Sequence, residues 1–314
     1  MKIITSKTKM ENPILLPSVI CKLITEYAVD YNLKLLDWIN IEKLDWRDIS
    51  VNPNAMDLLI THLDKIDWYM LSRNPNAKAI SLLIANQDKI CWWNLSANPN
   101  PKAISLLSEN LDKINWLQLS GNRNAIDLLK AHLDKINWIE ISRNPNAIDL
   151  LKAHNKICWS SLSSNPNAKA ISLLIANQDK IDWCSLSANP NTKAISLLAE
   201  NLDKINWYNL SSNPNNQSIL LLKENLDKVV WYRLSSNPND DAINLLMTKP
   251  DKINWYLLSR NPNAMRNHNA MNLIIANQDK IGWALISGNH NIFTNDITKY
   301  NNDVKILQSI LHGL

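Results

Sequence analysis

Glycine and cysteine are scarce in this chain of 314 residues, with four of each. So few glycines leave no glycine-rich loop of the kind that cradles phosphate groups. The cysteines (Cys21, Cys91, Cys158 and Cys184) form no C-x-x-C pair, and none lies at zinc-ligand spacing from a histidine. We therefore expect free thiols in a reducing compartment, and we predict neither a metal nor a cofactor.

Long apolar runs and a strong charge imbalance are also missing. The first residues, MKIITSKTKMENP, contain no apolar signal segment, and no run approaches the roughly 18 residues of a membrane span. Lys and Arg (33) exceed Asp and Glu (29) only slightly, and the excess is spread along the chain. Such a distribution gives no electrostatic footprint for nucleic acid or a lipid surface. We therefore expect an intracellular protein that is not secreted and binds neither nucleic acid nor membrane.

The residues that usually carry catalysis form no recognisable local arrangement. Three of the six histidines, His62, His132 and His154, occupy predicted helix ends, and His268 and His290 lie in Asn-rich turns. The sequence contains no H-E-x-x-H motif, and no Ser-His-Asp or Cys-His arrangement is indicated by local context. We therefore predict no catalytic residues and no enzyme activity.

Tryptophan and proline, in contrast, are abundant, with thirteen of each. Eleven tryptophans mark copies of a unit that reads approximately N-P-N-A-(x-x)-I-x-L-L-x-x-N-x-D-K-I-x-W-x-x-L-S-x. They follow one another at steps of 21 to 28 residues: Trp46, Trp68, Trp92, Trp116, Trp138, Trp159, Trp183, Trp207, Trp231, Trp255 and Trp283. A near-constant period of this length predicts a solenoid.

Each repeat is predicted to contain two short helices. Asn74 is a suitable N-cap for the first helix, with proline at the first helical position. The first helix ends at a position held by Asn or His, such as Asn86, because these residues tolerate left-handed backbone angles. Asp88 is placed to cap the second helix, on which Trp92 and Leu95 share one face.

We therefore predict an all-α fold, a right-handed-type α-solenoid of about eleven helix-pair repeats of 22–24 residues with helical caps. Residues 1–43 form an N-terminal helical cap, residues 44–290 the solenoid, and residues 291–314 a C-terminal capping helix that includes the amphipathic stretch 303–311. The eleven repeat tryptophans are expected to form a structural core between successive helix pairs.

One segment of the solenoid occurs twice. Residues 74–96 and 165–187 differ at only three positions, although they lie 91 residues apart. This distance is a whole number of repeats, so we interpret it as the duplication of a four-repeat block. Growth by duplication is tolerated in solenoids because each repeat contacts mainly its neighbours.

The two positions that follow each tryptophan vary most between repeats. They lie roughly 130° from the direction of the tryptophan and the leucine, and so on the outer face of the second helix. Aromatic residues and arginine, which are enriched at binding hot spots, recur there. We predict a partner-binding ridge that comprises Tyr69, Trp93, Tyr208, Tyr232, Arg233 and Tyr256. The alternative is that these side chains pack on the adjacent helix.

Two resemblances accompany these patterns. The sequence D-K-I-x-W-x-x-L-S-x-N-P-N-A, at residues 64–77 and 251–264, resembles the short Trp and Asn-Pro-Asn repeats of uncharacterised proteins from giant double-stranded-DNA viruses. That resemblance implies a repeat scaffold without a specific activity, in the host cytoplasm or associated with the virion. Near the N-terminus, Leu16-Pro17, the following aliphatic residues and Trp46 resemble an F-box. This second resemblance implies docking to the Skp1 adaptor of a cullin ubiquitin ligase.

The function predicted from the sequence is a non-enzymatic scaffold that binds a protein partner of unknown identity through the variable face of its second helices. Two alternatives remain open. The chain is either a substrate-selecting adaptor of a ubiquitin ligase, through the F-box-like N-terminus, or a structural or cementing protein of a virion.

Overall fold

The computed structural model describes residues 32–313. These residues belong to two compact parts: the larger comprises Leu36–Phe293, and residues 32–35 and 294–313 belong to the other. The F-box-like segment that begins at Leu16 lies mostly outside the described residues, as does most of the predicted N-terminal cap. The smaller part contains β1 (Leu33–Leu35), most of β2 (Phe293–Asn295), which pairs with β1, and the helix α23 (Ile297–Gly313). This helix covers the stretch 303–311 for which the sequence predicts a helix.

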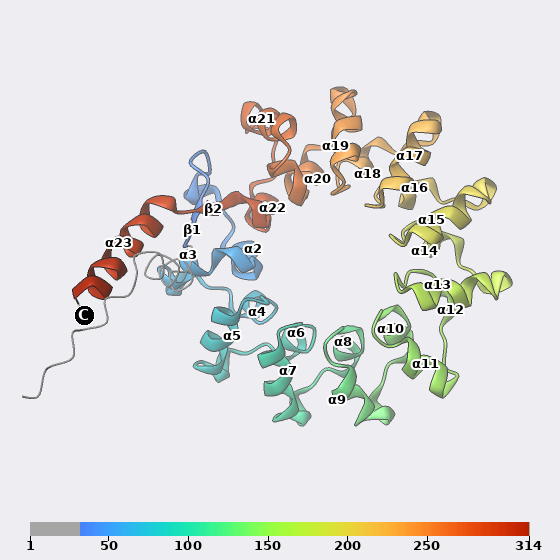
Figure 1. Cartoon of the computed structure of the whole chain (residues 1–314), viewed down its shortest axis with the longest axis horizontal. Helices are drawn as coiled ribbons and strands as arrows, with labels where there is room; N and C mark the ends of the chain where they lie inside the picture. Colours follow the sequence, from blue (N-terminus) through green and yellow to red (C-terminus); the bar gives the residue numbers. More distant parts are fainter. Residues whose placement is uncertain (1–31, 314) are drawn as a thin grey trace, which may run out of the picture. The chain divides into compact units, whose positions relative to one another are not determined.

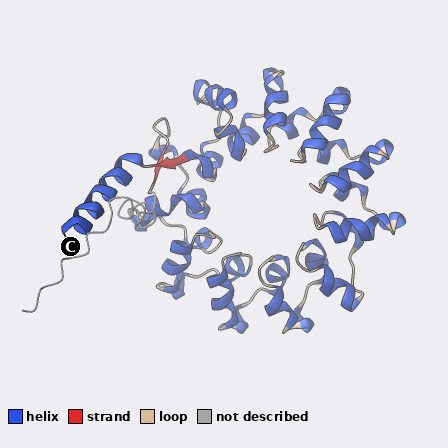
Figure 2. Cartoon of the chain, viewed as in Figure 1, coloured by secondary structure: helices blue, strands red, loops and turns tan. Residues whose placement is uncertain are grey.

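The larger part consists of the repeats, and within the described residues its helices alternate in two rows (Figure 2). The second helices, each of which begins at a repeat tryptophan, are α2 (Trp46–Val51), α4 (Trp68–Leu71), α6 (Trp92–Ser96), α8 (Trp116–Gly121), α10 (Trp138–Arg143), α12 (Trp159–Ser163), α14 (Trp183–Ser187), α16 (Trp207–Leu210), α18 (Trp231–Leu234), α20 (Trp255–Arg260) and α22 (Trp283–Ser287). The first helices are α3 (Met56–Ile60), α5 (Ala77–Ile84), α7 (Pro101–Ser108), α9 (Ile126–Lys130), α11 (Ile148–His154), α13 (Ala168–Ile175), α15 (Thr192–Ala199), α17 (Asn216–Glu224), α19 (Asp240–Met247) and α21 (His268–Ala276). The predicted all-α repeat solenoid is confirmed.

The caps of these helices differ from the sequence prediction. Helix α5 begins at Ala77, and its N-cap is Asn76, whose side chain accepts a hydrogen bond from the Lys78 amide. The prediction that Asn74 caps this helix is wrong, because its Oδ1 accepts from the Asn76 amide, which precedes the first helical residue. The prediction that Asp88 caps the second helix is also wrong: Asp88 lies in the 3-10 turn η4 (Gln87–Lys89). In several repeats the residue immediately before the tryptophan caps the second helix instead.

Asp67 is an example of such a cap, because its carboxylate accepts a hydrogen bond from the Met70 amide at 2.9 Å. The end of the first helix was also mispredicted. Asn86 has φ −135° and ψ 59°, which is not left-handed, and its Nδ2 donates to the Leu82 carbonyl at 2.9 Å. The side chain therefore satisfies a carbonyl of the last turn without a positive φ. Among the described non-glycine residues, Asn155 alone has a positive φ, of 48°.

The fully buried core is aliphatic. The residue three positions after each tryptophan is Leu or Ile, and it is completely buried in every repeat, as in Leu71, Leu95 and Leu186. Each such side chain contributes about 1.5–3 kcal/mol relative to its exposed state. The tryptophans themselves are half-buried at the joints between repeats. At seven joints a lysine of the following repeat lies over the tryptophan ring, for example Lys65 Nζ at 5.0 Å from the centre of Trp46.

Successive repeats are joined by buried polar side chains. The Asn74 Nδ2 donates to the carbonyls of Ser50 and Asn52, both at 3.0 Å, and its Oδ1 accepts from the Asn76 amide. The Ser50 hydroxyl donates to the Trp46 carbonyl and accepts from the amide of Asp67 in the next repeat. Equivalent bonds recur at every joint, and these Asn and Ser side chains are at most 4% exposed. At each joint, backbone carbonyls and amides that have no partner in a helix are therefore satisfied by the side chains of the repeat asparagine and serine.

The same joint connects the last repeat to the first. Asn52 Nδ2 donates to the carbonyls of Ser287 and Asn289, both at 3.1 Å, and the Asp45 amide donates to the Ser287 hydroxyl at 2.8 Å. Lys43 Nζ lies 4.9 Å from the centre of the Trp283 ring, and α2 packs against α22. These contacts match those of an internal joint in partners and distances. The repeats of Leu36–Phe293 therefore form a closed ring, with the second helices in its inner row (Figure 1).

Closure is the feature that the sequence did not predict. An open solenoid exposes a core face at each end, which is why we predicted caps. In the ring, the faces of the first and last repeats cover one another. The capping roles of residues 1–43 and 291–314 stay predictions.

Candidate partner-binding face

The residues predicted to bind a partner lie on the inner row of the ring. The first position after each tryptophan is exposed in all eleven repeats, and the second is half-buried or buried. Tyr69, Trp93, Tyr208 and Tyr232 are each 44–48% exposed, and Tyr256 is 63% exposed. Their exposure follows from the helix geometry, because the buried leucine and serine three and four positions after the tryptophan occupy the opposite side. A binding role for these residues remains a prediction.

A third variable position lies five residues after each tryptophan, where the side chain is exposed or half-buried, and sequence reasoning missed it. It is held by arginine in three repeats, at Arg73, Arg143 and Arg260, and by small residues in most others. We define the inner face as the side chains one, two and five positions after each tryptophan. The signal that would have revealed the third position is the same variability between repeats.

Tyr208, Tyr232 and Arg233 form one cluster on the inner face. The two tyrosine rings meet edge to face with their centres 5.9 Å apart, and the Arg233 guanidinium carbon lies 4.5 Å from the centre of the Tyr208 ring. Interaction with the Tyr208 hydroxyl raises the pKa of the Tyr232 hydroxyl. Arg233 also donates to the Ser212 hydroxyl at 2.9 Å, whereas its Nε is buried without a hydrogen-bond partner. The cluster is thus held rigidly, which lowers the entropic cost of binding to it.

Two asparagines on the inner face have a structural role. Asn94 Nδ2 donates to the Tyr69 carbonyl at 2.6 Å, and Asn209 Nδ2 donates to the Cys184 carbonyl at 2.9 Å. Each bond spans two neighbouring second helices. These asparagines therefore stabilise the face, and we do not count them among the candidate contacts.

Ring closure changes the arrangement of the aromatic residues. In the sequence they form two groups at opposite ends of the repeats, Tyr69 with Trp93 and Tyr208 with Tyr232 and Tyr256. In the ring, the order of second helices is α16, α18, α20, α22, α2, α4 and α6, so both groups belong to one continuous arc. The helices α8 to α14 complete the ring and carry no aromatic residue at the first position after the tryptophan.

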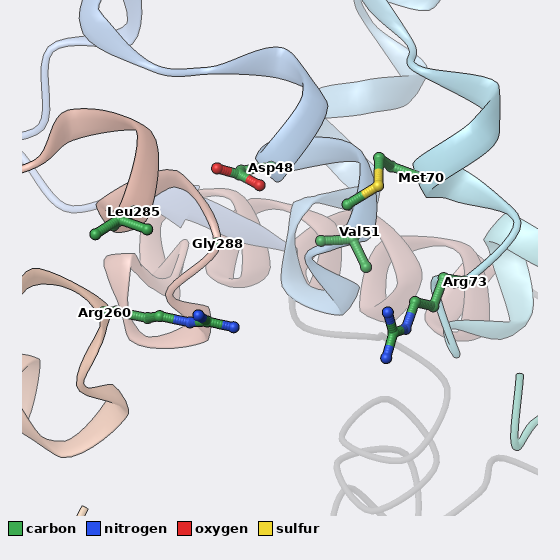
Figure 3. Close-up of a pocket in the computed structure, with 7 residues that line it drawn as sticks. All are labelled: Asp48, Val51, Met70, Arg73, Arg260, Leu285 and Gly288. Atoms are coloured by element: carbon green, nitrogen blue, oxygen red, sulfur yellow. The ribbon is translucent and has the colours of Figure 1, made fainter. Parts of the chain in front are cut away.

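The closure joint carries a cavity on the inner face (Figure 3). Its volume is about 330 Å³, and its lining comes from α2, α4, α20, α22, the second residue after α4 and the first residue after α22. The lining residues are Asp48, Val51, Met70, Arg73, Arg260, Leu285 and Gly288. Burial, and then the nearby Asp45, raises the pKa of the Asp48 carboxyl, while Arg47 and Arg260 oppose that rise.

Comparison with known proteins identifies no relative: no family model, no curated protein and no solved structure matches the chain significantly. Within residues 32–313, no helix is long and apolar enough to span a lipid bilayer.

Proposed function

We propose that this protein is a non-enzymatic scaffold that binds a protein partner through the inner face of its ring. The observation that carries the proposal is that, within each repeat, the buried positions are nearly constant and the exposed positions vary. The buried leucine, serine and asparagine recur in nearly every copy and build the joints. The exposed positions vary and hold the aromatic residues and arginines, which are the residue types enriched at binding hot spots.

The experiment replaces Tyr208, Tyr232 and Tyr256 together by alanine and compares capture of partners from the native cell by quantitative mass spectrometry. Because these side chains are exposed, we expect the fold to be retained and the specific partner to be lost. The matched control replaces exposed apolar residues of the first helices, Ile84 and Ile175, by alanine. Partner capture that survives the tyrosine replacements, or that depends equally on the control residues, refutes the proposal.

A further inference from the structure

The cavity at the closure joint has a simple origin in the repeat. Four of its lining residues, Arg260, Gly288, Val51 and Arg73, occupy the same position, five residues after the tryptophan, in four successive repeats around the ring. The two middle residues are small, and the two outer ones are arginines. Figure 3 shows the two guanidinium groups reaching toward the same space from opposite sides. The result is a recess between two positively charged side chains.

The arginines of this cavity are available to a ligand. In the described part of the chain, neither the Arg73 nor the Arg260 guanidinium makes a hydrogen bond or a salt bridge, and both residues are exposed. Asp48 is the single acidic side chain among the lining residues, so the cavity carries two positive charges and at most one negative charge. A guanidinium without a partner is a strong donor to carboxylates, with two parallel N–H groups for the two oxygens.

The positive charge is concentrated around the joint. From the tryptophan to the fifth residue after it, the repeats of α18, α20, α22, α2 and α4 carry Arg233, Arg260, Arg47 and Arg73 against Asp48, and the N-caps of α2 and α4 add Asp45 and Asp67. On the rest of the inner face, Arg143 lies 3.3 Å from the carboxylate of Glu140, so that pair is neutral. We call these five helices the closure arc. It lies within the arc of second helices from α16 to α6 that holds the aromatic residues, so exposed aromatic side chains and positive charge occur together.

The lining also has an apolar part. Val51, Met70 and Leu285 line the cavity together with the two arginines, Val51 and Met70 near Arg73 and Leu285 near Arg260 (Figure 3). An inorganic anion would leave this surface uncovered, whereas an acidic side chain with apolar neighbours would cover it. Asp48 in the same lining disfavours a continuous polyanion, because a run of phosphates would bring further negative charge against its carboxylate. The second helices also contain no lysine.

We propose that the cavity anchors an Asp or Glu side chain of an acidic peptide segment, whose apolar neighbours pack on Val51, Met70 and Leu285. This inference rests on the proposed function and specifies the chemistry of the partner. The carboxylate binds between Arg73 and Arg260, and the flanking residues extend along the closure arc toward Tyr69 on one side and Tyr256 on the other. Because the anchor spans the joint, it forms only in the closed ring.

The test measures the fluorescence anisotropy of a short fluorescein-labelled peptide that alternates Glu with Leu, titrated with the full chain. We expect Arg73→Gln and Arg260→Gln each to raise Kd by about tenfold, because each removes charge-assisted hydrogen bonds to the carboxylate. Asp48→Asn removes the competing charge and should lower Kd severalfold, a gain that misfolding cannot produce. Gly288→Leu fills the recess and should abolish binding. The Gly288 backbone permits this change, since an added Cβ meets no atom closer than 3.7 Å.

The controls separate this inference from the alternatives. A Gln–Leu peptide of the same length that binds as tightly, or arginine variants that bind the Glu–Leu peptide normally, would overturn the proposal. So would the absence of binding by the Glu–Leu peptide, or a tighter complex with an oligothymidylate, which would indicate a site for single-stranded nucleic acid. The capture experiment distinguishes the two proposals. If the partner is lost with the tyrosine variant but still binds Arg73→Gln and Arg260→Gln, the scaffold function is supported and the carboxylate-binding site is refuted.

Discussion

Closure of the ring makes a quantitative prediction about Asn52. Its side-chain amide is fully buried and donates to two carbonyls of the last repeat, those of Ser287 and Asn289. The substitution Asn52→Ala removes the donor to both carbonyls: the loss costs about 1–3 kcal/mol at Ser287, and about 0.5–1.5 kcal/mol at Asn289, whose carbonyl still accepts from the Ile292 amide. We therefore expect the free energy of unfolding to fall by about 2–4 kcal/mol, allowing for water that enters the space left by the amide.

The matched control is Asn165→Ala in the middle of the chain. Asn165 Nδ2 donates to the carbonyls of Ser142 and Asn144 at 2.9 and 3.1 Å, and this joint exists whether the ring is open or closed. Urea unfolding followed by circular dichroism should give similar losses for the two variants. A loss for Asn165→Ala with no loss for Asn52→Ala would refute closure, because in an open array the Asn52 amide would face water and its removal would cost little.

Three further predictions concern charge, repeat number and the N-terminus. Because burial raises the folded-state pKa of Asp48 above that of the unfolded chain, its ionised form destabilises the ring at neutral pH. Asp48→Asn should therefore unfold at a higher urea concentration at pH 7, and this advantage should vanish as the pH falls below the unfolded-state pKa; an advantage that persists in acid contradicts the reasoning. Deletion of residues 74–164, one copy of the duplicated block, should leave a folded but open arc of seven repeats by small-angle X-ray scattering, and a closed profile would contradict it. The ubiquitin-ligase alternative predicts that Skp1 co-purifies with the full chain and is lost on replacing Leu16 and Pro17 by alanine; its absence from the wild-type preparation removes that alternative.

The sequence was sufficient to predict the repeat because its strongest signals are local. Each tryptophan begins a second helix, and the leucine three positions later is buried, as the helical period requires. The assignment of caps failed for a different reason. Asn74 and Asn76 are the same residue type on either side of one proline, and either can serve as an N-cap. Both side chains donate from Nδ2 to the preceding repeat, and they differ in what Oδ1 accepts: that of Asn74 accepts from the Asn76 amide, before the helix, and that of Asn76 accepts from the Lys78 amide in its first turn.

The curvature of the repeat array, and thus its closure into a ring, could not be predicted from the sequence for a related reason. The rotation between repeats depends on how the inner and outer rows pack, which no single repeat specifies. The inner helices have four to six residues, as α4 and α8 do, whereas the outer helices range from five residues in α9 to eight in α5 and nine in α17. A wedge of this kind produces a ring only if the rotations of all repeats add up to a full turn. The two positions that follow each tryptophan were therefore predicted for the inner face, but not its third position, the joining of its two aromatic groups or the cavity between Arg73 and Arg260.

A closed ring gives the duplicated segment a different meaning from the one it has in an open solenoid. If every repeat contributes about one eleventh of a turn, the four repeats added by the duplication are required for the ends to meet. The two copies then occupy different places: α6 of the first copy lies at one end of the arc from α16 to α6 that holds the aromatic residues, and α14 of the second copy lies just outside the other end, beside α16. Two of their three differences fall on the inner face, where Trp93 and Asn94 of the first copy correspond to Cys184 and Ser185 of the second. The large aromatic side chain is thus present only in the copy that closure brings beside the proposed anchor site, as expected if partner binding is confined to that arc.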